Sequence, residues 1–383
     1  MGTYSNIQAH LGMNFDPIRN AAYARAIRAA VTQDSVVLDL GAGLGLLGLI
    51  AAQAGAKKVY LVEPEPVIEV TRKVVEDSGF ENVTCIESTA EGLQLPEKAD
   101  LIVSVMTGNF LLTEDLLPTL FHTRDRLLAP GGRLIPDCGR MWVVPVNCQA
   151  YYDRNIDGWS QTRPEEDSRS DFGVDYGPAR PYAANSLFYD TAEKFAAQWL
   201  APPSCLHELD LTTAVKAECD AQIEILTNAD GPCHGWLGWF DMRLGETWLS
   251  TGPDAEAMHW RQVFLPLERP VEVVTGQVLN FGLKRPEFGE WSWITETNGE
   301  RQSQSTFLSA PLSPDRLASQ AEGFKPVLQE KGRAMQFALS RFDGKHSVGE
   351  LADALLADSP DCFGSRREAL RFLKSLIKRN SNP

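Results

Sequence analysis

The sequence of 383 residues lacks the signatures of several large protein classes. No apolar run approaches the roughly 20 residues that a membrane-spanning helix needs, and the opening MGTYSNIQAH has no signal-peptide pattern, so we expect no membrane segment. The seven cysteines form no CxxC pair, which argues against a metal site or disulfide framework and for a cytoplasmic protein. A GxSxG nucleophile elbow and a Walker loop are also missing, which disfavours a hydrolase or nucleotide triphosphatase.

Positive charge is scarce as well. There are 36 Lys and Arg against 51 Asp and Glu, giving a net charge of −15. We therefore expect no nucleic-acid partner, because phosphate binding needs a basic face. The charge is uneven, since the chain from Lys325 onward carries +4 and the rest carries −19. An acidic body would attract a cationic substrate, although solubility alone explains the charge equally well.

Between residues 35 and 137, short β-branched runs alternate with helical stretches. This alternation predicts a Rossmann-like parallel sheet with crossover helices, in a first domain of residues 1–136. The expected strands cover 35–40, 58–63, 83–86, 100–105 and 133–136. Asp16-Pro17 is expected to begin a helix before the sheet, and Gly79 to end one within it.

The composition changes after Asp137. Residues 137–312 hold all nine tryptophans and alternating runs such as AQIEIL, which predict an antiparallel β-barrel. An insertion is expected at about 153–200, with a helix near TAEKFAAQWL. Residues 313–383 are expected to form a small helical domain.

The strongest local pattern is VVLDLGAGLGLLGL at residues 36–49. A buried strand ends at Asp39, and Gly41, Gly43 and Gly45 turn the chain into a helix with its backbone open to a ligand. A dinucleotide fingerprint would need glycine where Leu46 stands. The pattern therefore favours another cofactor, one with an amino group for the carboxylate.

Two further carboxylates follow in order. Glu63 ends the second strand, where a carboxylate is placed to accept both hydroxyls of a ribose. Glu91 follows the third strand and is placed to accept an adenine amino group. Together with the glycine turn, these residues predict binding of S-adenosylmethionine.

At this point the chain resembles the protein arginine N-methyltransferase family. VLDLGAGLGLLGLIAAQAGAKKVYLVEPEP resembles the first two motifs of that family, SVMTGNFLLTEDLL its substrate-clamp loop, and MHWRQVFLPLERPVEVVTGQVL its His-Trp loop. The resemblance implies that His10 and Arg19 touch the cofactor, Arg19 through its carboxylate. It also implies that Asp16 pairs with His259, where a carboxylate would fix the imidazole tautomer and support its charged form.

One position departs from the family. Its members grip the substrate guanidinium with two glutamates in the clamp loop; the second is present as Glu114, whereas the first is replaced by Val105. Losing one partner of such a pair typically costs about 2–5 kcal/mol. Val105 therefore indicates a changed substrate, a replacement carboxylate such as Asp115, or lost activity.

Other parts of the resemblance concern assembly. Tyr4 matches a tyrosine of the family's amino-terminal motif, and the segment around 181–200 falls where the dimerisation arm of a ring-shaped homodimer would lie. FDGKHSVGELA resembles small winged-helix-like modules, including PqqD-type peptide binders. That unit could equally be a cap that packs on the barrel or mediates dimerisation.

Three functions remain open from sequence. The first is a methyltransferase that acts on a guanidine or similar nitrogen of a peptide or small metabolite, with Glu114, His259 and Asp16 organising the acceptor. The second is an N- or O-methyltransferase of an uncharged biosynthetic intermediate, which Val105 favours. The third is a non-catalytic scaffold, against which the retained cofactor residues argue.

Overall fold

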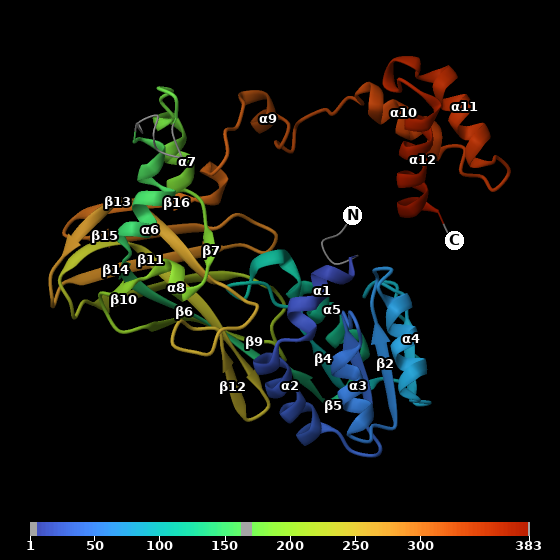
Figure 1. Cartoon of the computed structure of the whole chain (residues 1–383), viewed down its shortest axis with the longest axis horizontal. Helices are drawn as coiled ribbons and strands as arrows, with labels where there is room; N and C mark the ends of the chain where they lie inside the picture. Colours follow the sequence, from blue (N-terminus) through green and yellow to red (C-terminus); the bar gives the residue numbers. More distant parts are fainter. Residues whose placement is uncertain (1–5, 162–170, 382–383) are drawn as a thin grey trace. The chain divides into compact units, whose positions relative to one another are not determined.

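The computed structural model describes residues 6–161 and 171–381, and the chain forms two compact units, Met1–Pro311 and Leu312–Pro383. Tyr4 and residues 162–170 of the expected insertion lie outside the described ranges. The larger unit contains a parallel α/β half and an antiparallel half, which lie side by side in Figure 1.

The α/β half is built on a five-stranded parallel sheet in the order β3-β2-β1-β4-β5. Its strands are β1 (Val36–Leu40), β2 (Lys58–Val62), β3 (Val83–Ile86), β4 (Ala99–Ser104) and β5 (Leu128–Ile135). Every residue of β1 is buried, as expected for a central strand covered on both faces. The accompanying helices are α1 (Ile7–Asn14), α2 (Pro17–Ala30), α3 (Leu46–Gln53), α4 (Ile68–Ser78) and α5 (Leu117–Leu127).

Local chemistry sets the ends of these helices. Asp16 caps α2 through its side chain, and Pro17 occupies the first turn, where its missing N–H costs nothing. Gly79 ends α4 in the left-handed conformation that glycine adopts readily. Both helix limits follow from the sequence.

The antiparallel half consists of two sheets. The larger sheet contains β6 (Cys138–Asn147), β7 (Phe188–Asp190), β8 (Gln198–Trp199), β9 (Ser204–Asp210), β11 (Gly231–Leu244), β12 (Thr247–Ser250) and β13 (Gln262–Val273). The smaller sheet contains β10 (Cys219–Leu226), β14 (Val278–Arg285), β15 (Ser292–Thr297) and β16 (Glu300–Ser305). The predicted fold class, a Rossmann-like methyltransferase domain followed by an antiparallel β-barrel domain and a helical unit, is confirmed, and the expected barrel is built from these two antiparallel sheets.

Tryptophans fill the space between the two sheets. Trp236 of β11 and Trp293 of β15 are fully buried, and each indole N–H has a partner in the other sheet. Trp236 donates to Oγ1 of Thr295 at 2.9 Å, and Trp293 donates to the carbonyl of Pro266 at 2.8 Å. These bonds satisfy polar atoms that would otherwise be buried at a cost.

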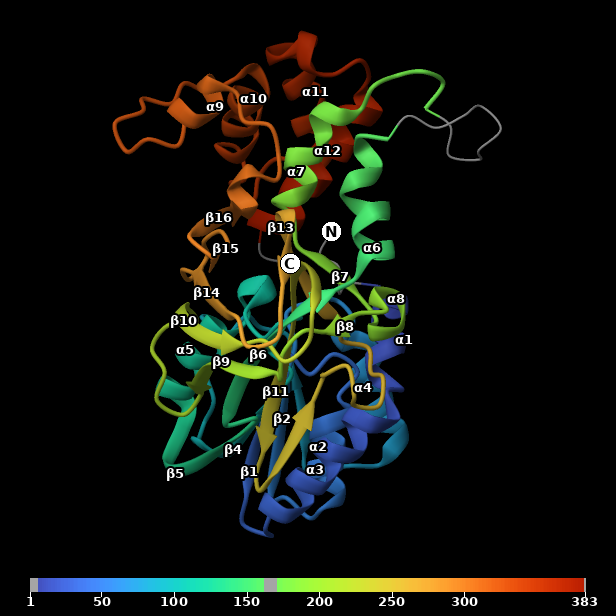
Figure 2. The same ribbon diagram turned by 90° about the vertical axis from the view of Figure 1, so that its left-hand side faces the viewer.

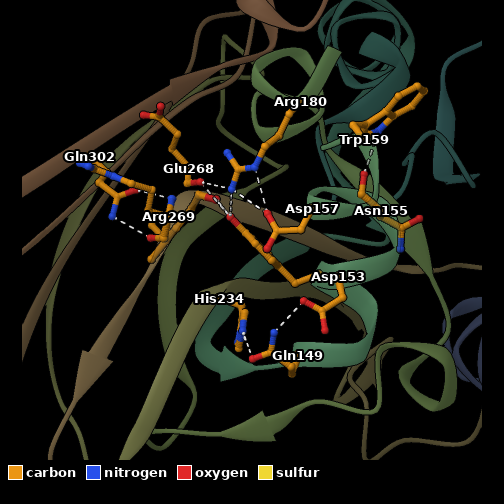
Figure 3. A network of polar contacts seen from close by, with 12 residues as sticks. Gln149, Asp153, Asn155, Asp157, Trp159, Arg180, His234, Glu268, Arg269 and Gln302 are labelled. Carbon is orange, nitrogen blue, oxygen red and sulfur yellow. Dashed lines mark hydrogen bonds and ion pairs between the residues drawn. The ribbon is translucent and has the colours of Figure 1, made fainter. Parts of the chain in front are cut away.

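A segment here called the arm, residues 149–161 and 171–184, projects from the antiparallel half (Figures 1 and 2). It lies mostly before residues 181–200, where the sequence placed the arm, because most of 188–199 forms β7, α8 (Ala192–Phe195) and β8. It contains α6 (Gln149–Asn155) and α7 (Arg180–Ala184). Figure 3 shows the polar contacts at its base, where Arg180 bridges Asp157 and the carbonyl of Glu268. The hydroxyl of Tyr152 donates to the carbonyls of Leu267 and Glu268 at 2.8 and 2.9 Å. The arm is thus tied to β13 at both of its helices.

The helix expected near residues 191–200 is mostly wrong. Only α8 (Ala192–Phe195) forms, because Ala196 takes a left-handed conformation and ends it. Gln198–Trp199 then pairs with β6 as β8. Phe195 packs on Tyr151 and Phe264, so burial of its ring decides the local structure against helix propensity.

The smaller unit is helical in its described part, 312–381. It consists of α9 (Pro314–Ala318), α10 (Glu330–Leu339), α11 (Val348–Asp358) and α12 (Arg366–Asn380). Its own core includes Leu351, Leu355, Leu373 and Leu376. No strand occurs in that part, so the wing of a winged-helix module is absent from it. Across all described residues, none of the helices has the length and apolar character to cross a membrane.

Candidate active site

Three glycines shape the turn between β1 and α3. Gly41, Gly43 and Gly45 have φ angles of 71°, 53° and 82°, which residues with a side chain rarely adopt. A Cβ atom on Gly41 would lie 2.8 Å from Cε of Met106, and one on Gly43 would lie 3.0 Å from Nδ1 of His10. Glycine therefore keeps the backbone of this turn accessible to a ligand.

Two buried carboxylates stand beside the turn. Oδ2 of Asp39 accepts a hydrogen bond from the backbone N–H of Gly48 at 2.7 Å. Glu63 accepts from the backbone N–H groups of Gly43 and Glu65 at 2.9 and 3.0 Å. These bonds fix both side chains, and each carboxylate keeps further acceptor positions for a ligand.

The pKa of the Asp39 carboxyl group lies close to neutral pH. Burial raises its pKa to about 7, the backbone N–H of Gly48 and the charge of Arg19 oppose the rise, and Glu63 adds to it. Near pH 7 this carboxyl group is therefore shared between its protonated and ionised forms. A cationic group bound beside it would favour the ionised form and release a proton.

Arg19 brings a positive charge to the same region. It lies on α2 and is buried, and its Nε and Nη2 donate to Oδ1 of Asn20 at 3.0 and 2.8 Å. Burial lowers the pKa of Arg19, yet a guanidinium stays protonated at neutral pH. Its Nη1 makes no hydrogen bond to any residue in the described ranges, so it can bind an anionic group.

Asp16 joins the start of α2 to the loop before β13. Its Oδ1 accepts from the backbone N–H groups of Ile18 and Arg19, which caps the helix. Its Oδ2 accepts from the backbone N–H of His259 at 3.0 Å and from Nδ1 of the same residue at 2.9 Å. One carboxylate therefore holds both the helix and the imidazole, and Nε2 is left as the acceptor atom of the neutral ring.

Asp16 supports the charged form of His259, as expected, but burial of the imidazole outweighs this support. Burial lowers the pKa of His259, and the hydrogen bond to Asp16 does not offset this effect. Burial also raises the pKa of Asp16, but the hydrogen bonds from His259 and from the backbone of Arg19 outweigh it and leave the pKa lowered. At neutral pH the pair is thus an ionised carboxylate and a neutral imidazole.

Residues 105–115, here called the clamp loop, have an unusual backbone. Phe110, Leu111, Glu114 and Asp115 all have positive φ angles, between 51° and 72°. Such angles cost about 1 kcal/mol or more each and persist only where the surroundings enforce them. Phe110 and Leu111 are fully buried and supply that enforcement, while Glu114 is exposed toward the cavity described below.

Asp115 points to the antiparallel half instead. It forms an ion pair with Nη2 of Arg285 at 2.5 Å and accepts a hydrogen bond from the backbone N–H of Phe288 at 3.0 Å. Arg285 is almost completely buried on β14. The hypothesis that Asp115 replaces the missing clamp carboxylate is therefore wrong, because its charge already neutralises a buried cation.

A single cavity of about 430 Å³ brings these groups together. Its size is in the range of small-molecule sites. Of the expected site residues, those that line it are His10, Arg19, Asp39, Gly41, Gly43, Glu63, Glu114 and His259, and Val105 lines it as well. Asp16 does not line the cavity, but it accepts hydrogen bonds from two residues that do, His259 and Arg19.

Comparison with known proteins supports a family assignment. A model described as "Methyltransferase domain" matches residues 37–132, and one described as "Arginine methyltransferase oligomerization subdomain" matches residues 137–287. Protein arginine N-methyltransferase 6 of Xenopus tropicalis is 30% identical over 295 residues, which cover 72% of this chain and 84% of that protein. The chain belongs to the protein arginine N-methyltransferase family.

Other members of the family differ in length. The probable histone-arginine methyltransferase CARM1 of Oryza sativa subsp. indica is 30% identical over 289 residues, so the chain spans about half (53%) of that relative. Among solved structures, the Trypanosoma brucei PRMT1 enzyme-prozyme heterotetrameric complex with AdoHcy has a TM-score of 0.72 at 27% identity. The match covers 79% of this chain and 99% of that chain.

Glu91 is the expected cofactor residue that the structure does not bring to the cavity. It is exposed and absent from the cavity lining. Its own backbone N–H and the side chain of Thr89 hydrogen-bond to the carboxylate and lower its pKa. Its assignment as an adenine acceptor has no support in this geometry.

Sequence reasoning missed several lining residues, among them Met106, Thr107 and Asn109. Asn109 accepts a hydrogen bond from the backbone N–H of Arg261 at 2.8 Å and so ties the clamp loop to the His-Trp loop. No pattern marks these positions, because each acts through contacts between distant segments. The clamp-loop resemblance gave the only signal for this region.

All seven cysteines are free. Within residues 6–161 and 171–381, no three His, Cys, Asp or Glu side chains gather in a way that could hold a metal ion.

Proposed function

We propose that this chain transfers a methyl group from S-adenosylmethionine to a guanidine nitrogen of an arginine-bearing peptide. The observation that carries the proposal is the single cavity where the glycine turn after β1 meets Glu114 and His259. Membership of the arginine methyltransferase family supports it, since relatives at 30% identity bear that activity in their names.

The residues of the turn fit this cofactor. Arg19 would hold its carboxylate through Nη1, and ionised Asp39 would attract its cationic end. Glu63 would accept hydrogen bonds from the ribose hydroxyls, and the bare backbone at Gly41 and Gly43 leaves room beside them. When bound, S-adenosylmethionine supplies an electrophilic methyl group on a sulfonium sulfur.

The acceptor side of the cavity fits a cationic nitrogen. The carboxylate of Glu114 would orient a guanidinium through charge-assisted hydrogen bonds. Neutral His259, with Nδ1–H directed to Asp16, presents Nε2 as the atom that takes up the proton released from the methylated nitrogen.

A second candidate is methyl transfer to an uncharged nitrogen or oxygen. The observation that favours it is Val105, which lines the cavity where the family has its first clamp glutamate. An apolar wall at that position suits a neutral group better than a guanidinium.

Transfer of labelled methyl from S-adenosylmethionine to arginine-bearing peptides tests the first candidate against the second. Glu114→Gln should lower kcat/KM about 30- to 1000-fold, because it removes one partner of a charge pair, while cofactor affinity measured by calorimetry should stay the same. Glu246→Gln, at an exposed turn between β11 and β12, is the matched control and should change neither. Labelling of neutral amines or hydroxyls instead of arginine would select the second candidate, and absence of cofactor binding would overturn both.

We further propose that the chain forms a homodimer through the arm. Trp159, Val174, Tyr176 and Tyr182 are exposed there, an unusual concentration of apolar side chains for a surface. A second apolar set is exposed on the α/β half: Ile7, Leu11, Phe15, Val70 and Val74. The match to the oligomerization subdomain and the heterotetrameric assembly of the Trypanosoma brucei neighbour support self-association, and the two apolar sets are the surfaces that we propose to pair.

Light scattering after gel filtration tests the dimer. The double variant Trp159→Ser and Tyr176→Ser should be a monomer at concentrations where the unmodified chain is a dimer. Val215→Ser removes an exposed apolar side chain elsewhere and should leave the mass unchanged. An unmodified chain of monomer mass would contradict the proposal.

The free cysteines support our placing of the chain in a reducing compartment such as the cytoplasm.

A further inference from the structure

A second recess of about 560 Å³ is lined by charged side chains that the proposed reaction does not use. They come from three elements: Arg154 from α6, Asp190 to Lys194 from the segment around α8, and Arg261 from the start of β13. The full lining is Arg154, Asp190, Thr191, Glu193, Lys194 and Arg261.

The charges of this recess, here called the basic recess, do not cancel. Nζ of Lys194 lies 2.9 Å from Oδ1 of Asp190, so these two side chains neutralise one another. The remaining lining charges are Arg154 and Arg261 against Glu193 alone. Neither arginine forms an ion pair with a carboxylate in the described ranges; the guanidinium of Arg261 donates to the carbonyl of Met258 at 3.3 Å. The net positive charge of the recess is opposite in sign to the total charge of the chain, −15.

Arg261 connects the basic recess to the acceptor side of the cavity, because it bonds to Asn109, which lines that cavity. Arg261 directly follows His259 and Trp260, which both line the cavity, and its backbone N–H is bonded to Asn109 of the clamp loop. Asp190 directly follows Tyr189, which lies close enough to Thr113 of the clamp loop to interact with it electrostatically. Two independent chain segments thus link the recess to the loop that carries Glu114.

We propose that the basic recess binds a carboxylate of the methyl acceptor and so selects peptides with an acidic residue near the target arginine. The inference rests on the proposed function. The acidic body repels an acidic peptide in general, whereas Arg154 and Arg261 offer local charge-assisted hydrogen bonds to a carboxylate. The acceptor is then read at two points, by a carboxylate that holds its guanidinium and by arginines that hold its carboxylate.

Peptides with one central arginine test this. A single aspartate is moved along the peptide, and each version is paired with its asparagine analogue. Affinity is measured by fluorescence anisotropy with the full chain and S-adenosylhomocysteine, so no transfer is needed for the readout. At the favoured position the aspartate peptide should bind about three- to tenfold more tightly than its analogue, and the ratio should shrink at high salt because exposed charges are screened.

Variants assign the effect to the recess. Arg154→Gln and the double variant Arg154→Gln with Arg261→Gln should bring the aspartate-to-asparagine ratio toward one while leaving the asparagine peptide unaffected. Lys216→Gln with Lys284→Gln, two exposed cations elsewhere on the antiparallel half, removes the same charge and should preserve the ratio. Peptides that end in a free carboxylate are also compared with the same peptides ending in an amide. This comparison shows whether the recess binds an aspartate side chain or the carboxy-terminal carboxylate of the peptide.

The outcomes separate this inference from the proposed function. Equal affinity of aspartate and asparagine peptides at every position would overturn the inference alone. An equal effect of the control pair would do the same, because net charge would then explain the preference. Failure of every arginine peptide to bind, with the cofactor product bound, would overturn the proposed function and this inference together.

Discussion

Val105 occupies the position where the cavity differs most from the family pattern. Its side chain is half-buried and lines the cavity that Glu114 also lines. A carboxylate at position 105 would give a guanidinium a second charged partner. We therefore expect Val105→Glu to raise kcat/KM for arginine peptides about ten- to hundredfold, since a second charge-assisted contact contributes roughly 1.5–3 kcal/mol.

The control for this gain is Val105→Gln, which has nearly the same shape without the charge. It should leave kcat/KM unchanged or lower it, because the half-buried amide carries no charge with which to bind the substrate guanidinium. Steady-state rates with one arginine peptide decide the matter. An equal rise in both variants would show that size at position 105, and not charge, limits the reaction.

The pair of Asp16 and His259 predicts a pH dependence of defined sign. The proposed proton acceptor is the neutral form of His259, and burial lowers the pKa of this residue from 6.5, so activity should persist as the pH falls below 6.5. Asp16 raises that pKa through its hydrogen bond and charge. Asp16→Asn should therefore move the acid limb of kcat/KM to lower pH, while the asparagine still caps α2.

The acid limb is measured from a pH–rate profile of the unmodified chain and of Asp16→Asn. The melting temperature of each shows whether the helix cap is kept. Ser313→Asn, a helix cap in the smaller unit, is the matched substitution and should leave the acid limb in place. An acid limb that moves to higher pH in Asp16→Asn would contradict the assignment of His259 as the acceptor.

At the scale of elements, burial decides what the sequence can predict. The parallel strands are predictable because runs such as VVLDL are apolar throughout and end in glycine turns. The clamp loop is not, because positive φ angles at Phe110 and Leu111 are imposed by packing and have no local signature. The same limit explains why Asp115 was a plausible clamp residue: only the fold reveals that Arg285, 170 positions away, takes its charge.

The bond between Asp115 and Arg285 fastens the clamp loop to β14. Arg285 is buried, and its Nε already lacks a hydrogen-bond partner in the described part of the chain. Asp115→Asn should therefore cost about 2–4 kcal/mol of stability, because an uncompensated buried charge remains. It should also lower kcat/KM by releasing the loop that carries Glu114, without changing cofactor affinity.

Asp220→Asn is the control. Asp220 of β10 forms an exposed ion pair with Lys284 of β14, the strand that also carries Arg285. An exposed pair contributes at most about 1 kcal/mol, so this variant should unfold close to the unmodified chain. Urea denaturation gives the stabilities. Similar losses in both variants would show that the Asp115 bond does not anchor the loop.

At the scale of the whole molecule, the residues that line the cavity all belong to one of the two compact units. Every residue that lines the cavity lies between His10 and Trp260, within Met1–Pro311. The unit Leu312–Pro383 has its own apolar core, and its residues from Lys325 onward carry a net charge of +4. The described lining of the cavity therefore comes from the larger unit.

A chain that ends after Pro311 should accordingly fold and bind S-adenosylmethionine with unchanged affinity. In calorimetry the full chain should show two transitions, the smaller with an enthalpy of about 50 kcal/mol, as expected for a unit of 72 residues. That transition alone should vanish in the shortened chain, because each unit buries its own core. A shortened chain that loses cofactor affinity more than about tenfold would instead show that the smaller unit stabilises the site, since that loss corresponds to about 1.4 kcal/mol of coupling between the units.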